Sequence, residues 1–139
     1  DEAMLKALHK KLEDEGAAPL VIAPTLASIG SVQPDATVTG MPSIMCDALV
    51  LCGGDAGAKL LAQSGDARHF VLEAFKHLKA IAALGAGRDV LHAAHLPDHA
   101  DGVATGDDGD LDKVLKAFVT AAGQHRVWSR AALAESVPA

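Results

Sequence analysis

Residues 79–91, KAIAALGAGRDVL, have the order of an active-site elbow. The apolar run 80–84 predicts a buried strand, residues 85–87 a tight turn, and residues 89–91 the start of a helix. Enzymes hold a nucleophile on such a strained turn, exposed above the sheet. Here the turn consists of Gly85, Ala86 and Gly87, none of which has a nucleophilic side chain. The pattern therefore predicts the framework of a catalytic turn without a catalytic group.

Two cysteines are the remaining candidate nucleophiles, and they flank the strand predicted over residues 47–53. Six residues of extended chain separate Cys46 from Cys52 by roughly 20 Å, which is too far for a disulfide bond. Neither cysteine lies at a predicted helix start that would lower its pKa. We therefore expect two free, core-packed thiols, as in a reducing compartment, and we predict a cytoplasmic protein.

Two sets of side chains have spacings that could suit a metal ion. They are His69, Glu73 and His77 in the first set, and His92, His95 and His99 in the second. The first set is more typical of a solvated helix face opposite the apolar face of the same helix. Pro97 interrupts the second set, and neither contains an HExxH motif. We predict no metal site.

Serine and phosphate chemistry have less support. No serine stands in a G-x-S-x-G motif. The glycine turns at 52–55 (CGGD) and 85–87 (GAG) match neither the dinucleotide-binding fingerprint nor a P-loop. Backbone N–H groups in such turns can bind anions, so a small-molecule binding module remains an alternative.

Helical and strand patterns alternate along the chain. Helices are predicted over residues 2–15, 55–61, 67–79, 88–94 and 110–125, and strands over 19–24, 47–54, 80–84 and 101–106. Asp55 and Asp66 are the expected N-caps of the second and third helices. Residues 31–40 look like a small hairpin or an excursion off the main sheet. The alternation predicts one α/β domain over residues 1–139, with a parallel sheet and helices on both faces.

The first predicted element is a helix, whereas doubly wound folds normally begin with a strand that lies inside the sheet. We therefore expect the first strand to be missing from this chain. Its absence would leave unpaired backbone groups and an exposed apolar slot. A run of about five to seven apolar residues is expected upstream.

Composition excludes several classes of partner. The net charge is −6 and there is no basic run, so we expect binding neither to nucleic acid nor to anionic membranes. Half of the 139 residues are hydrophobic, but only three are Phe, one is Trp and none is Tyr. We expect the single tryptophan, Trp128, to be packed, either against the sheet edge or against another domain.

Three segments in order carry a family resemblance: DALVLCGG (47–54), ARHFVLEAFKHLKAIAALGAG (67–87) and FVTAAGQHRVWSR (118–130). Together they resemble the C-terminal domain of large-subunit monofunctional haem catalases, over nearly the whole chain. That domain is similar to PfpI-type proteases and class I glutamine amidotransferases. The resemblance implies a flavodoxin-like doubly wound parallel sheet.

The resemblance also implies a function for the empty elbow. The PfpI-type elbow reads IAAxCxG, and alignment on residues 81–83 places its cysteine at Gly85. The elbow is then vestigial, and no catalytic, cofactor-binding or metal-binding residue is expected in this chain. The implied parent is a tetrameric haem catalase, an oxidoreductase that decomposes hydrogen peroxide in the oxidative stress response. The implied partners are the catalase core and the other subunits of the homotetramer.

Without any tyrosine, the chain cannot supply the axial ligand that the parent core would use for haem. The expected role is accessory: covering and stabilising the core. The alternative from another class is a stand-alone PfpI-like cysteine hydrolase or glyoxalase that uses Cys46 or Cys52.

Overall fold

Three parallel strands form the main sheet, in the order β3 (Ala48–Leu51), β4 (Ala80–Leu84), β5 (Val103–Gly106). The computed structural model describes residues 1–139. The register pairs Leu49 with Ile81, and Ile81 with Val103. All five residues of β4 are buried, as expected for a central parallel strand that is covered on both faces.

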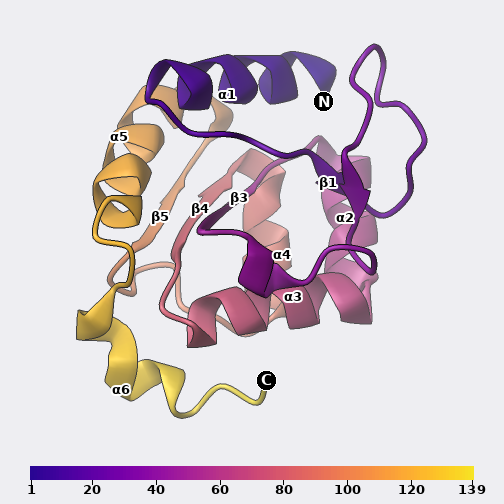
Figure 1. Cartoon of the computed structure of the whole chain (residues 1–139). Helices are drawn as coiled ribbons and strands as arrows, with labels where there is room; N and C mark the ends of the chain where they lie inside the picture. The colour runs from indigo at the N-terminus through magenta and orange to yellow at the C-terminus, as the bar shows by residue number, and fades with distance from the viewer.

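Helices cover both faces of this sheet (Figure 1). Helices α1 (Glu2–Asp14) and α5 (Leu111–Ala122) pack on one face. Helices α2 (Asp55–Gln63), α3 (Gly65–Lys76) and α4 (Arg88–Ala93) pack on the other. Alternate residues of β4 enter the two cores: Ile81 and Ala83 face α3 and α4, while Ala82 and Leu84 face α1 and α5. The predicted α/β class with helices on both faces is therefore confirmed.

Two of the expected helix caps are wrong. Ser64 is the N-cap of α3, and its hydroxyl accepts a hydrogen bond from the Ala67 N–H at 3.2 Å. Asp66 instead lies in the first turn of α3. Likewise α2 begins at Asp55, with Gly54 at the N-cap and no side-chain cap. Both aspartates still favour these helices, because a carboxylate near the N-terminus complements the helix dipole.

The two predictions for residues 19–40 are also wrong in detail. The expected strand 19–24 shortens to β1 (Ile22–Ala23), outside the main sheet, and Leu20 is 52% exposed. Residues 31–40 form no hairpin, because β2 (Ala36–Thr37) pairs in parallel with β1; the alternative expectation of an excursion off the main sheet is confirmed. The prolines on either side of β1 and before β2 limit the ladder to two residues, since proline lacks the backbone donor.

The C-terminal segment contains η4 (Trp128–Arg130) and α6 (Ala131–Ala134), and a buried arginine anchors it. The Arg130 guanidinium donates hydrogen bonds to the carbonyl oxygens of Asp101 at 2.8 Å, Phe75 at 3.1 Å and Lys79 at 2.7 Å. It also lies over the Phe75 ring, 4.3 Å from the centroid. Burial lowers the pKa of Arg130 to about 10.

Trp128 does not pack within this domain, because its exposed fraction is 72%. Val127 and Arg130 on either side both point inward, and the short 3-10 turn then directs the indole outward. The expectation that Trp128 packs against the sheet edge is wrong. Among the helices, none is both long and apolar enough to cross a membrane.

Candidate functional site

The elbow lies where it was predicted, directly after β4. Gly85 has φ +51 and opens the 3-10 turn η2 (Gly85–Gly87), after which α4 begins at Arg88. This left-handed conformation costs a residue with a Cβ about 1–2 kcal/mol, whereas glycine adopts it freely. Glycine at this position therefore gives an elbow with the shape of a nucleophile turn but without its strain.

The position of the missing side chain is occupied by a neighbouring carboxylate. A Cβ placed on Gly85 would overlap the Asp108 side chain, with the Oδ2 atom of that carboxylate at 3.1 Å. Asp108 belongs to η3 (Asp108–Asp110), the 3-10 turn that follows β5. Because the Asp108 side chain is exposed and can rotate, this overlap is relieved at little cost, so the elbow lacks the nucleophile but not the room for one.

A single arginine joins the elbow to the loop after β5. The Arg88 Nε atom donates to the Gly85 carbonyl oxygen at 3.2 Å, and the Nη2 atom donates to Asp107 Oδ1 at 2.5 Å. Asp107 also belongs to a capping box with Asp110. These polar groups are paired with one another, and none is a base placed against a hydroxyl or thiol, as covalent catalysis requires.

The far side of the elbow packs against backbone. A Cβ on Gly87 would overlap the Leu51 carbonyl oxygen and stand 3.0 Å from the Cys52 nitrogen. Only glycine allows this close approach of η2 to the end of β3. The turn residues thus have a packing role that does not depend on catalysis.

Neither cysteine is activated. Cys46 and Cys52 are both free and partly buried, as expected. Burial raises the pKa of both thiols, and the nearby Lys79 charge only partly offsets this effect at Cys46. A raised pKa keeps a thiol protonated near neutral pH, and the nucleophile is the thiolate.

The histidine sets do not form a metal site in the structure. His69 pairs with Glu73 at 3.4 Å on the exposed face of α3, and His77 lies at the C-cap of that helix. His92 pairs with Asp98 at 2.8 Å near the end of α4. No group of three or more His, Cys, Asp or Glu side chains lies together in an arrangement that could hold a metal ion.

The sequence analysis missed a buried polar network beside β4. Lys79 is 1% exposed and donates to the Ser43 carbonyl oxygen at 2.5 Å, while the Ser43 hydroxyl donates to Glu73 Oε2 at 2.9 Å. Burial lowers the pKa of Lys79. This is not a serine–lysine catalytic pair, because the Ser43 hydroxyl is hydrogen-bonded to Glu73 and is buried away from solvent. The one sequence feature that could have indicated this buried network is the lysine that directly precedes the apolar run 80–84.

The fold and the elbow define a class: a parallel α/β domain that keeps a nucleophile turn without a nucleophile. The model for the C-terminal domain found in long catalases matches residues 1–132, and the chain belongs to this family. The resemblance to large-subunit catalases is thereby confirmed.

Several catalases are similar to this chain over almost its full length. The chain is 40% identical to catalase HPII of Pseudomonas putida, covering 100% of this chain and 19% of that protein. It is 32% identical to catalase HPII of Pseudomonas aeruginosa, covering 99% of this chain and 20% of that protein. Catalase HPII of Mycobacterium avium is 36% identical over 92% of this chain and 20% of that protein. The chain thus spans about a fifth of the length of these relatives.

Proposed function

We propose that this chain is a non-catalytic accessory domain of a long catalase whose full-length form decomposes hydrogen peroxide to water and oxygen. Membership of the family of C-terminal domains in long catalases supports the catalase context. The single observation that carries the non-catalytic role is the elbow. Gly85 opens the turn directly after β4, at the position of a nucleophile, and has no side chain that could attack a substrate.

The proposed work of the domain is to cover and stabilise the catalase core within a cytoplasmic homotetramer. Haem belongs to the core in this proposal, and this domain binds no cofactor. The exposed apolar side chains Trp128 (72%) and Leu133 (50%) support a contact with the rest of the polypeptide. Both belong to the short segment formed by η4 and α6, and apolar patches at a surface are typical of interfaces.

An activity assay of the 139-residue chain tests the non-catalytic role. Ester, peptide and methylglyoxal substrates are assayed before and after alkylation of both thiols. The expected rate equals the background rate in buffer without protein. Turnover that alkylation abolishes would instead favour the cysteine hydrolase or glyoxalase alternative, with Cys46 or Cys52 as nucleophile. The raised pKa values of both thiols argue against that alternative.

A second assay tests the stabilising role. The full-length protein is compared with a form that lacks residues 1–139, at matched haem content. Peroxide decomposition per haem should be similar at low temperature, while the shortened form should lose activity faster on heating. Equal inactivation half-lives would contradict a stabilising role.

A further inference from the structure

A cavity lies at the end of α4 that is opposite to the elbow. Its volume is about 470 Å³, and it is bounded by α3, by the end of α4 with the loop that follows, and by α6 with the tail after it. Figure 1 shows this tail passing beneath α3. Sites for small molecules have volumes of roughly 300–1,000 Å³. The cavity is therefore large enough for a small organic ligand.

The deepest side chains of this cavity are apolar. Phe75 of α3, Leu96 after α4 and Val137 of the tail line it, and all three are buried. Leu72 of α3 adds a half-buried wall. A ligand with an apolar body would remove its own surface and part of this wall from water, which is the main favourable contribution to binding in such a cavity.

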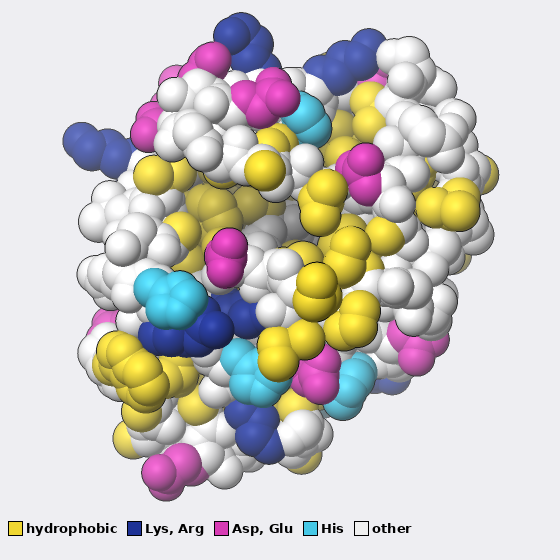
Figure 2. Space-filling model, viewed as in Figure 1, with side chains coloured by type: hydrophobic (Ala, Val, Ile, Leu, Met, Phe, Trp, Pro, Cys, Tyr) yellow, Lys and Arg dark blue, Asp and Glu magenta, His cyan; other side chains and the backbone are white.

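The ionisable side chains around this cavity are all basic. They are Arg68 and His69 of α3 and His95 after α4, and all three are exposed. No aspartate or glutamate lines the cavity, although acidic residues outnumber lysine and arginine by 18 to 12 in the chain. Figure 2 shows a different hollow, of about 670 Å³, below α1, and its only charged lining residues are Glu15 and Asp47. The cavity at the end of α4 therefore favours an anion.

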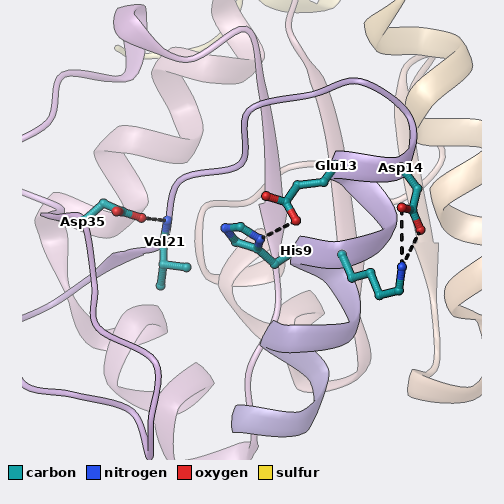
Figure 3. Close-up of polar contacts among 6 residues, drawn as sticks. His9, Glu13, Asp14, Val21 and Asp35 are labelled. Carbon is teal, nitrogen blue, oxygen red and sulfur yellow. Dashed lines mark hydrogen bonds and ion pairs between the residues drawn. The ribbon is translucent and has the colours of Figure 1, made fainter.

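Arg68 has no acidic partner within the domain. Cations on α1 pair with a carboxylate one helical turn away: Lys10 Nζ lies 3.1 Å from Asp14 Oδ2, and His9 Nδ1 lies 3.4 Å from Glu13 Oε2 (Figure 3). The Arg68 guanidinium forms no ion pair, because none of the residues three or four positions away on α3 is acidic. Its planar fork of N–H donors is therefore free to bind a carboxylate.

The backbone of His95 holds an imidazole at the rim of the cavity. His95 follows α4 with φ +56, the left-handed conformation in which many helices end on glycine. Its N–H donates to the His92 carbonyl oxygen at 2.9 Å, and the Leu96 N–H donates to the Leu91 carbonyl oxygen at 3.2 Å. A residue with a Cβ is less stable than glycine in this conformation. The fold thus keeps a side chain here at a cost in stability, as ligand sites often do.

We propose that this cavity binds a small aromatic carboxylate. The ring packs on Phe75, Leu96 and Val137, and the carboxylate accepts hydrogen bonds from the Arg68 guanidinium and the His95 imidazole. One permanent positive charge balances the single charge of a carboxylate, whereas a phosphate monoester carries about −1.5 to −2 near neutral pH. The site and the elbow lie at opposite ends of α4, and the site is independent of the catalase role.

Titration calorimetry with three ligands of the same ring system tests the site. The probes are naphthoate, the neutral naphthamide and naphthyl phosphate, each added to the 139-residue chain. Naphthoate should bind roughly 10-fold or more tightly than naphthamide, because a hydrogen bond to an ionised group is stronger than one between neutral groups. It should also bind more tightly than naphthyl phosphate. Equal affinity for naphthoate and naphthamide, or no binding of naphthoate, would overturn the proposal, and tighter binding of the phosphate would overturn the choice of a carboxylate.

Three variants locate the binding. His95→Gly removes the imidazole and relaxes the left-handed turn, so naphthoate affinity should fall roughly 5-fold while Tm stays the same or rises. Arg68→Gln should reduce the affinity for naphthoate to that for naphthamide. Lys116→Gln is the matched control, because it removes one positive charge from an exposed position outside the cavity lining, and it should leave the affinity unchanged. Unchanged affinity in either cavity variant would overturn the role of that side chain, and an equal loss in the control would overturn the site.

The full-length polypeptide tests whether the cavity stays open beside the rest of the protein. Leu133 lies at its rim and is 50% exposed, so a neighbour that packs on this side chain would close the cavity. Phenylglyoxal modifies accessible arginines, and the rate at Arg68 is followed by mass spectrometry with and without naphthoate. Naphthoate should slow the modification in both the 139-residue chain and the full-length protein. An Arg68 that resists modification in the full-length protein without naphthoate would make the cavity an internal interface and overturn the proposal. Peroxide decomposition enters neither measurement, so the outcome is independent of the accessory role proposed above.

Discussion

Replacing Gly87 by alanine tests whether the elbow is retained for packing alone. The added methyl group would overlap the Leu51 carbonyl oxygen and lie 2.6 Å from the Leu51 carbonyl carbon. These atoms are backbone at the end of β3, which is held in the sheet by β4. No change of side-chain rotamer can relieve the overlap, so either η2 or the strand end must shift.

The structure sets the size of the effect. Overpacking costs about 1–3 kcal/mol, and contact with backbone places this site near 3 kcal/mol. Alanine also lowers the conformational entropy of the unfolded chain, and this effect offsets up to about 1 kcal/mol of the cost. The expected net loss in the free energy of unfolding is about 2 kcal/mol. For a domain of this size that loss lowers Tm by roughly 6 °C.

Urea unfolding followed by circular dichroism measures this loss. Gly57→Ala is the matched control, because a Cβ at Gly57 in α2 meets nothing within 4 Å. The control should be neutral or stabilising by up to about 1 kcal/mol. If Gly87→Ala is as stable as Gly57→Ala, the elbow does not pack against β3 and the structural explanation of its glycines is wrong.

Three further predictions concern the tail and the buried thiol. Arg130→Met removes three hydrogen bonds to backbone carbonyls, of which only that of Phe75 keeps another donor, and should cost about 3 kcal/mol in urea unfolding; a loss below about 1 kcal/mol would contradict the anchor. Burial raises the pKa of the Cys52 thiol above its ordinary value, so at alkaline pH the unfolded state releases the thiol proton first. Wild-type stability should therefore fall faster there than that of Cys52→Ala, and parallel pH curves would refute this. Trp128→Ala should change the stability of the isolated chain by less than about 0.5 kcal/mol. The fluorescence of Trp128 should be that of a solvated indole in the isolated chain and shift to the blue in the full-length protein, whereas a buried-type spectrum in the isolated chain would contradict its exposure.

Sequence patterns were sufficient where one local signal decided the structure. The run 80–84 is apolar at every position and bounded by glycine, so both the strand and the elbow were predictable. The amphipathic pattern of α5 was equally clear. By contrast, residues 19–24 have the composition of an inner strand, but only Ile22 and Ala23 form a strand, and that strand pairs with β2 outside the main sheet. The apolar pattern therefore predicted a place in the sheet that β1 does not occupy.

Buried charges were not predictable from local pattern. Lys79 and Arg130 are both 1% exposed, although lysine and arginine are mostly surface residues. Their partners are backbone carbonyls, 36 residues away for Lys79 and as many as 55 away for Arg130. Such partners leave no spacing signal in the sequence. The absence of a metal or cofactor site stays a prediction for the same reason, since distant side chains form such sites.

The anchoring of the tail has a consequence for synthesis on the ribosome. Arg130 supplies donors to carbonyls of Phe75 and Lys79, and Val137 completes the core that faces α3 and α4. Until these residues have been synthesised, the Lys79 carbonyl lacks its hydrogen-bond donor, the Phe75 carbonyl keeps only the bond from the Leu78 N–H, and the core stays open. Chains fold from the N-terminus as they emerge, but this domain can close only after Arg130 and Val137 have left the ribosome. A nascent chain stalled before Arg130 should therefore remain a substrate for chaperones and proteases.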